Sequence, residues 1–146
     1  MDVRIHRLGD LPPRLLHAML RLRQNVFIVE QQGICEDIDE NDIDAWHTVV
    51  VAPGSRVIGC CRLREQPSAY WRIQRVAVDR AWRRQGIAHG MLFRTIEHAH
   101  RLGAAGIALN AQLHAKSVYD RLGFTAVSDV YDDDGDLHVA MSLTLR

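Results

Sequence analysis

The sequence predicts an α+β fold in which a single domain spans residues 1–146. A chain of 146 residues has the length of one domain that can bury a core without disulfides or metals. Strand-like runs alternate with turns in the middle of the chain, and residues 88–102 then place apolar side chains at helical spacing. No repeat, linker or low-complexity tract divides the chain. We therefore expect strands and helices to share one core.

The N-terminal part predicts a strand followed by a helix. Val3 and Ile5 alternate with polar residues, which is typical of a half-buried strand. Asp10 precedes Pro12 and Pro13, so we expect Asp10 to cap a helix whose first turn contains proline. The apolar side chains that follow at helical spacing are Leu15, Leu16, Met19 and Leu20.

The middle of the chain predicts three strands and a long helix. Residues 48–52 and 57–64 flank a Pro-Gly-Ser turn and are expected to form an antiparallel hairpin. Residues 70–78 form a third strand-like run, after which a polar loop leads into the helix over 88–102. Gly103 is suited to the end of this helix because glycine readily adopts the left-handed conformation found there.

The C-terminal part predicts a buried strand, a short helix and a final hairpin. Residues 105–109 are short and apolar, and residues 115–122 predict a helix that ends before a glycine. Residues 124–130 and 138–145 are expected to pair across the Asp134–Gly135 turn.

Composition argues against several classes of protein. Apolar residues make up 47% and charged residues 25% of a chain without net charge, so no global charge favours a nucleic acid or a membrane surface. The N-terminus lacks a signal-peptide stretch, and no run approaches the roughly 18 apolar residues of a membrane span. The cysteines lack C-x-x-C spacing and indicate free thiols, with Cys60 and Cys61 in a buried strand. We expect a cytoplasmic protein with no nucleic-acid, membrane or metal partner.

Charged residues are unevenly distributed along the chain. Arginines dominate residues 56–101, whereas residues 36–44 and 129–136 are strongly acidic. This pattern favours an anion site in the middle and a cation site nearby. A solvated surface in a chain biased toward arginine is the alternative.

The loop before the long helix is suited to bind an anion. The first N–H groups of a helix lack backbone partners and carry partial positive charge, which favours a phosphate group. Gly86 lets a ligand approach the backbone closely, and Arg80, Arg83 and Arg84 add positive charge. The loop matches neither a Walker loop nor the G-x-G-x-x-G dinucleotide pattern. Taken alone, it leaves open a glycine helix start with surface arginines.

Two motifs resemble the GNAT superfamily of N-acetyltransferases. The segment Arg83-Arg84-Gln85-Gly86-Ile87-Ala88 matches the family's [QR]-x-x-G-x-[GA] acetyl-CoA motif and directly follows a predicted strand, as it does in the family. The segment Tyr119-Asp120-Arg121-Leu122-Gly123-Phe124 resembles the family's downstream Y-x-x-x-G-F segment. The order of the predicted strands and helices fits the family across nearly the whole chain.

Further segments resemble the ElaA-type branch of this superfamily. They are residues 26–32, Asp37-Ile38-Asp39, Ala111-Gln112-x-His114 and the stretch from Val130 to His138. The resemblance implies a three-layer α/β sandwich with a mixed, mostly antiparallel sheet of about six to seven strands and helices on both faces.

The resemblance also implies a site for acetyl-CoA. Backbone groups of Val76, Ala77 and Val78 are expected to pair with the pantetheine arm, and an N–H near Val76 to polarise the thioester carbonyl. Gln112 stands where many relatives have asparagine and is expected to contact pantetheine. The residues expected to hold the pyrophosphate are Arg83, Arg84, Gln85, Gly86, Ile87, Ala88 and His89.

Tyr119 matches the family's proposed general acid, because the leaving thiolate needs a proton from a donor of comparable pKa. Packing of this ring onto the core beside a phenylalanine is the alternative.

The identity of the general base stays open, since residues 71–75 lack the glutamate that many relatives carry on this strand. Glu30, which lies in an apolar run, His47 and His114 are candidates, and a water chain is another.

The acidic segment 36–44 begins like a calcium loop but does not continue as one. Asp42 would occupy the position that requires glycine, and Thr48 the position that requires glutamate. We expect instead that residues 30–44 line the acceptor site, where Asp39, Asp42 and Asp44 attract a cationic amine. A solvated loop is the alternative.

The activity implied by the resemblance is transfer of an acetyl group from acetyl-CoA to a primary amine in a ternary complex. The amine belongs to a small molecule or a peptide. A CoA-binding regulatory or interaction module with little catalysis is the alternative, because the strand carboxylate is missing. The oligomeric state stays open, a homodimer included.

Overall fold

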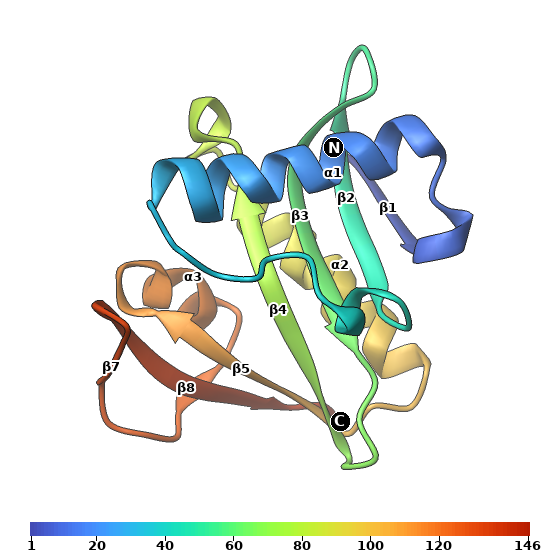
Figure 1. Cartoon of the computed structure of the whole chain (residues 1–146). Helices are drawn as coiled ribbons and strands as arrows, with labels where there is room; N and C mark the ends of the chain where they lie inside the picture. The colour runs from blue at the N-terminus through green and yellow to red at the C-terminus, as the bar shows by residue number, and fades with distance from the viewer.

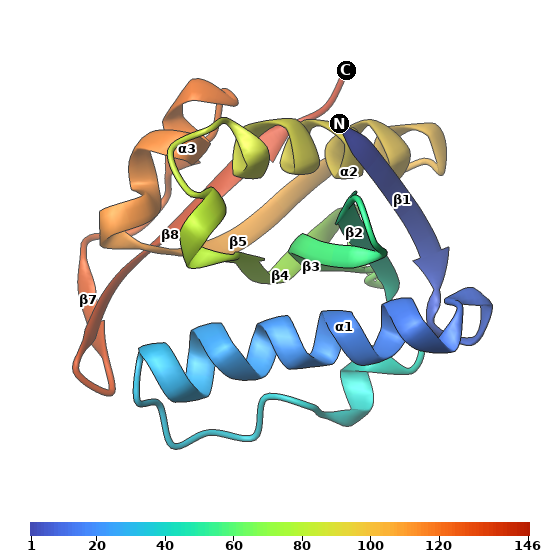
Figure 2. The ribbon, with the colours of Figure 1, turned by 90° about the horizontal axis from the view of Figure 1, so that it is seen from above.

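The computed structural model describes residues 1–146, in which a central sheet separates two layers of helices (Figures 1 and 2). The strands are β1 (Asp2–Arg7), β2 (Trp46–Ala52), β3 (Arg56–Arg64), β4 (Tyr70–Val78), β5 (Gly106–Gln112), β6 (Thr125–Ala126), β7 (Tyr131–Asp133) and β8 (Asp136–Thr144). The helical segments are η1 (Leu8–Asp10), α1 (Pro13–Arg23), η2 (Gln24–Glu30), η3 (Glu40–Asp42), η4 (Arg80–Trp82), α2 (Ile87–Arg101), η5 (Leu113–Ala115) and α3 (Lys116–Arg121).

The sheet follows the order β1-β2-β3-β4-β5-β8-β6, with β7 paired to β8. Every neighbouring pair is antiparallel except β4 and β5, which run parallel. Helix α1 covers one face, and α2 and α3 lie on the other (Figure 2). The predicted mixed, mostly antiparallel sheet between helices is confirmed; it has eight strands because β6 and β7 are separate short pieces. None of the helices has the length and apolar character that crossing a bilayer requires.

Helix α1 begins later than the sequence predicts. Asp10 belongs to the short turn η1 and does not cap α1; Pro12 is the N-cap and Pro13 the first helical residue. Proline suits this position because it has no N–H to leave unpaired. After Arg23 the chain continues as a π-helix, η2, over the segment predicted only as a short apolar run. This extension carries Glu30 to the end of α1's layer.

The two faces of the sheet bury separate apolar clusters. Leu15 and Met19 of α1 pack with Cys60 on one face, and Met91 of α2 packs with Cys61 on the other. Adjacent residues of a strand point to opposite faces, so the two cysteines are not facing one another. Burial raises the pKa of both thiols, that of Cys61 to about 11. The predicted place of these cysteines in the core is confirmed.

The final hairpin differs from the prediction for residues 124–130. Only Thr125–Ala126 of this range forms a strand, β6, whereas β7 begins at Tyr131. The Ser128 hydroxyl accepts a hydrogen bond from the backbone N–H of Ala140 at 3.0 Å, so a side chain takes the place of ladder pairing there. The predicted Asp134–Gly135 turn is confirmed, and both residues have positive φ, as a tight hairpin turn requires.

A buried ionic network lies on the α1 face of the sheet. Arg23 donates to Asp42 at 2.7 Å and to Asp37 at 3.1 Å, and it is 1% exposed. Arg62, equally buried, donates to Asp42 at 3.0 Å. The other ion pairs of the network join Arg62 to Asp39, Arg75 to Asp37, and Arg75 to Asp39.

This network corrects the expected role of the acidic segment 36–44. Asp39 and Asp42 face arginines and do not present free charge to an amine. Burial opposes the ionisation of Asp42, but hydrogen bonds from Arg23 and Arg62 outweigh it and hold the pKa of this carboxyl below its ordinary value. Charged groups are buried at low cost only when they are paired in this way.

Replacement of Asp42 by asparagine is expected to lower the free energy of unfolding by about 3 kcal/mol, because it leaves two buried guanidinium groups short of a negative partner. The exposed Asp44, in the same segment, provides the control, and Asp44→Asn should change stability by less than about 0.5 kcal/mol. Urea unfolding of the three proteins measures both effects. Equal stabilities would contradict the importance of the network.

The pH dependence of unfolding gives a second readout of the same change. The pKa values of Asp39 and Asp42 are lowered in the folded state. Their contribution to stability is therefore complete above the unfolded value of about 3.9 and is lost as the pH falls below it. Asp42→Asn should lose less stability than the wild type between about pH 4 and pH 2.

Candidate active site

Strands β4 and β5 pair only at one end and then part. Three residue pairs join them, from Tyr70 opposite Gly106 to Arg72 opposite Ala108. Beyond this point β4 stays paired to β3 as far as Val78, and β5 to β8 as far as Gln112. The second half of β4 therefore has an unpaired backbone edge inside the sheet, where an extended ligand can add as a strand.

A β-bulge at Arg75 marks the place where β4 turns away. The pairing with β3 shifts between Cys60 and Arg62, and Arg75 has a φ of 56°. A bulge bends its strand, and a non-glycine residue with positive φ persists only where its surroundings hold it. The Arg75 guanidinium is held 3.1 Å from Asp37 and 3.3 Å from Asp39. The ionic network thus supports the separation of the strands.

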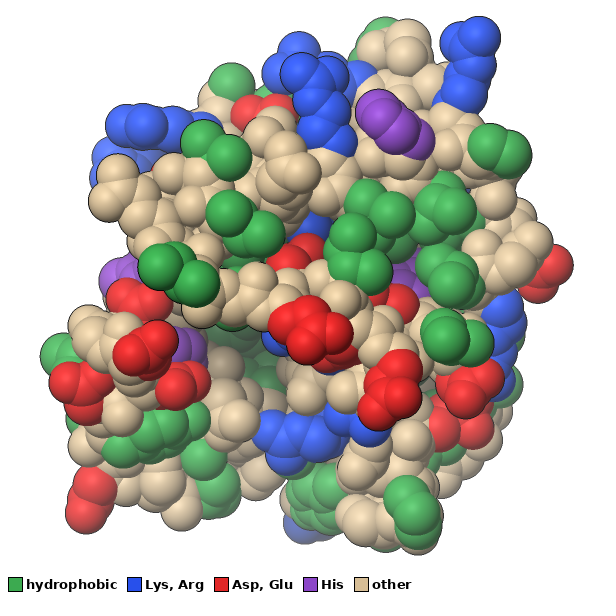
Figure 3. Space-filling view, in the orientation of Figure 1, with side chains coloured by type: hydrophobic (Ala, Val, Ile, Leu, Met, Phe, Trp, Pro, Cys, Tyr) green, Lys and Arg blue, Asp and Glu red, His purple; other side chains and the backbone are tan.

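The separated strands border a cavity of about 450 Å³. Residues 31–37 close it on the α1 side, α3 contributes Tyr119, and the β7–β8 hairpin forms its wall at the wide end. Figure 3, which views the α1 side, shows acidic side chains on both sides of a hollow in this region. The residues that line the cavity from the two strands are Arg72, Ile73, Gln74, Arg75, Val76, Leu109, Asn110 and Gln112.

The loop after β4 presents backbone N–H groups at the start of α2. Gly86 is the N-cap of α2, has a φ of 78°, and provides no side chain to cap the helix. Arg84 also has positive φ, at 62°, so the chain turns sharply before the helix. A Cβ at Gly86 would meet no protein atom within 4 Å. The predicted anion site therefore has free donors, space and positive charge.

Comparison with known proteins identifies the family to which this fold and cavity belong. A family model described as an acetyltransferase (GNAT) domain matches residues 24–145. The chain belongs to the GNAT acetyltransferase family. Members of this family transfer acyl groups from acyl-CoA, and the predicted resemblance is confirmed.

Individual relatives match nearly the whole chain. A UPF0039 protein of Schizosaccharomyces pombe is 30% identical over 139 residues, which are 94% of this chain and 93% of the relative. The crystal structure of an acyl-CoA N-acyltransferase from Pseudomonas aeruginosa has a TM-score of 0.87 and 32% identity and covers 97% of each chain. That of Escherichia coli ElaA has the same TM-score, 28% identity and the same coverage. The likeness to ElaA agrees with the predicted branch.

Within this GNAT fold, Tyr119 of α3 lines the cavity. Its side chain is 6% exposed and packs edge-to-face on Phe124 at 5.7 Å between ring centroids. Its hydroxyl makes no hydrogen bond within the protein, and burial raises the pKa of this group. The ring packs beside Phe124, as one of the two sequence interpretations expects, and it also lines the cavity, as a role in proton donation requires. The hydroxyl is therefore a neutral, unengaged donor at the cavity wall.

Glu30 lies outside the cavity and pairs with Arg83 in the loop that precedes α2. Its carboxylate accepts hydrogen bonds from both terminal nitrogens of Arg83, at 2.5 and 2.8 Å. These bonds, opposed by partial burial, lower the pKa of Glu30. The shift runs opposite to the one that would make Glu30 a strong base, so the GNAT site offers no support for that role.

The two candidate histidines also lie away from the cavity. His114 is exposed on η5. His47 is buried in β2, where Nε2 lies 2.8 Å from the backbone carbonyl of Asp42 and burial lowers its pKa. Gln112, in contrast, does line the cavity, and its amide donates to Gln31 at 3.2 Å.

The segment 30–44, which the sequence led us to expect beside the acceptor site, contributes Gln31, Gly33, Ile34, Cys35 and Asp37 to the cavity, whereas other cavity residues were not predicted. Asp37 is 5% exposed, and its Oδ1 accepts no hydrogen bond although Arg75 Nε lies 3.1 Å away. The acidic composition of residues 129–136 is evident from the sequence, but only the pairing of β7 with β8 shows that this stretch forms one wall of the cavity. The unpredicted wall residues include Phe27, Arg72 and His138.

Replacement of Glu30 by glutamine tests its role directly. Because Glu30 is engaged with Arg83, Glu30→Gln should leave kcat within about twofold and the pH profile of CoA release unchanged, with any effect confined to the KM for acyl-CoA. Steady-state kinetics across pH measures this. A loss of about 100-fold in kcat with a changed acidic limb would instead identify Glu30 as the base.

Proposed function

We propose that the protein transfers an acetyl group from acetyl-CoA directly to a primary amine in a ternary complex. The unpaired edge of β4, which lies between the loop before α2 and a cavity lined by Tyr119, is the observation that carries this proposal. Family membership supports acyl transfer from acyl-CoA. Acetyl as the acyl group, the amine acceptor and the residue roles are the parts that we add.

The donor would bind along β4 and the loop that follows it. Backbone N–H groups of residues 83–88 hold the pyrophosphate, with His89 beside them, because a helix start favours anions. The pantetheine arm pairs with Val76, Ala77 and Val78 as an added strand. For Gln112 to contact this arm, its amide turns away from Gln31.

The acceptor amine would enter the cavity from the side opposite to the donor. Its nitrogen attacks the thioester carbon, and an N–H near Val76 stabilises the negative charge that develops on the carbonyl oxygen. The carbon–sulfur bond then breaks, and the thiolate takes a proton from the Tyr119 hydroxyl. The amine gives up its own proton to water in the open cavity, and the Tyr119 phenolate regains a proton from that water. Holding both substrates together replaces a bimolecular encounter with an intramolecular reaction.

A screen of amines and peptides for release of free CoA tests the proposed activity. Turnover of at least one class of primary amine is expected. Tight binding of acetyl-CoA without turnover of any amine would contradict acetyl transfer and favour a CoA-binding regulatory module.

Tyr119→Phe should lower kcat by about 100-fold, because the thiolate loses its proton donor. The free energy of unfolding should hardly change, since the Tyr119 hydroxyl has no hydrogen-bond partner to lose. Tyr70→Phe is the control, because Tyr70 loses a phenol hydroxyl that contacts Thr144 away from the cavity. Undiminished turnover by Tyr119→Phe across pH would show that Tyr119 is not the acid.

Gly86→Glu should abolish measurable acetyl-CoA binding, because it puts bulk and negative charge where the pyrophosphate is expected. Gly54→Glu is a matched control: Gly54 has a similar φ, of 82°, and an added Cβ there also meets no protein atom within 4 Å. Calorimetric titration with acetyl-CoA compares the two variants at equal backbone strain. Retained affinity in Gly86→Glu would contradict the assigned phosphate site.

A further inference from the structure

Arg64 of β3 and Arg72 of β4 lie directly opposite each other in the sheet; Arg72 lines the end of the cavity where β4 and β5 are still paired, and Arg64 borders the neighbouring hollow beside Asp44 and Glu65. Residues opposite one another in an antiparallel pair share a face, and like charges placed so destabilise the sheet. Both side chains are partly buried, yet neither forms an ion pair or a hydrogen bond within the chain. An anion bound between them would remove the repulsion.

Three arginines on the α1 face of the sheet are neutralised. Arg23, Arg62 and Arg75 each contact two aspartates. The same acidic segment leaves Arg72 without a partner although Arg72 lines the same cavity as Asp37. The absence of a partner for Arg72 is therefore specific to this end of the cavity. Figure 3 shows acidic and basic side chains gathered together at the centre of this face.

The charge along the cavity changes sign from one end to the other. Arg72 lies where β4 and β5 are still paired, whereas the wide end is bordered by Asp133, Asp134 and Asp136, none of which forms an ion pair. Val76 lies four positions after Arg72, or at most about 13 Å along the strand. Between the ends, Asp37 is paired with Arg23 and Arg75, so the unpaired acids of the cavity are those at its wide end.

We propose that the acceptor is a bipolar molecule, whose anionic group binds Arg72 and Arg64 while its primary amine lies toward the wide end of the cavity. The assignment of the amine rests on the proposed acetyl transfer; the anion site rests on the arginine pair alone. Carboxylate and phosphate both suit it, because a guanidinium group binds either with two parallel hydrogen bonds. The distance of about 13 Å along β4 from Arg72 to Val76 favours an amine and an anion separated by several bonds over a simple α-amino acid.

Matched probes separate the anion from the amine. The probes are ε-aminocaproate with its amide, and aminohexyl phosphate with aminohexanol; each pair differs in the anionic group. Calorimetric titration into CoA-saturated protein should show binding of the anionic member at least about tenfold tighter than its neutral partner. The tighter of the two anionic probes identifies carboxylate or phosphate as the natural group.

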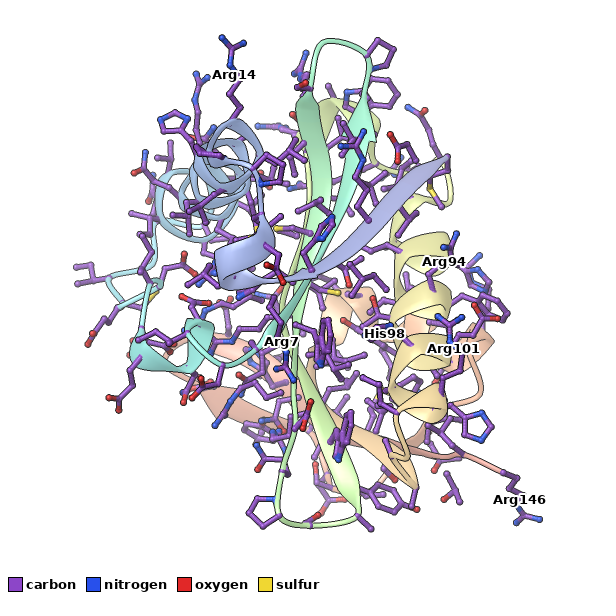
Figure 4. The ribbon with its side chains drawn as sticks, turned by 90° about the vertical axis from the view of Figure 1, so that its right-hand side faces the viewer. Arg7, Arg14, Arg94, His98, Arg101 and Arg146 are labelled. Carbon is purple, nitrogen blue, oxygen red and sulfur yellow. The ribbon has the colours of Figure 1, made fainter.

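Arg72→Gln and Arg64→Gln should each remove most of this preference. Arg14→Gln is the charge-matched control, because Arg14 points outward from α1 into solvent, away from the cavity (Figure 4), and it should keep the full preference. Equal affinity of paired probes for the wild type would overturn the proposal. A preference that survives in Arg72→Gln, or no binding of either anionic probe, would do so as well.

Thermal unfolding distinguishes this binding role from a structural one. Removal of one of two repelling charges should leave the melting temperature of Arg72→Gln at or above that of the wild type at low salt. A clear decrease would contradict the repulsion on which the proposal rests.

Release of CoA, recorded with the same amines, separates this proposal from the proposed function. A binding preference without CoA release contradicts acetyl transfer and supports the anion site. CoA release without any preference supports acetyl transfer and overturns the anion site.

Discussion

The parting of β4 and β5 is the constraint on which the rest of the structure depends. A sheet normally pairs its inner strands along their whole length, because unpaired backbone groups inside a protein are costly. Here the pairing ends at Arg72 and Ala108, and the bulge at Arg75 bends β4 away. The exposed edge, the cavity and the start of α2 all follow from this separation, and they meet at the end of β4.

The ionic network is what holds the bend in place. The segment 36–44 has no regular structure beyond one short turn, yet its aspartates bind arginines from α1, β3 and β4. Asp37 contacts Arg75 at the bulge and also reaches the cavity wall. One acidic loop thereby fixes the backbone of β4 and forms part of the site. Asp37, Asp39 and Asp42 of this loop are all paired with arginines. The aspartates of the site that form no ion pair lie on the β7–β8 hairpin.

Local features of the site could be predicted from the sequence, and distant pairings could not. The loop before α2 could be recognised as a candidate anion site because a glycine at a helix start, arginines and a preceding strand lie within a dozen residues. The position of Tyr119 followed from its motif. The network joins Asp37 to Arg75 across 38 positions, and no local pattern distinguishes such paired acids from free ones. The role of Arg72 could not be predicted from the sequence either, because only the strand register places this residue opposite Arg64.

The central claim is that acyl-CoA binds along the unpaired edge of β4 and at the start of α2. Hydrogen–deuterium exchange of the protein with and without CoA tests it most directly. Slower exchange should be confined to the amides of Val76–Val78 and of residues 83–89, because these groups are predicted to bind the ligand. Exchange in β1 and β2 should not change. Protection elsewhere, or none at saturating CoA, would contradict the account.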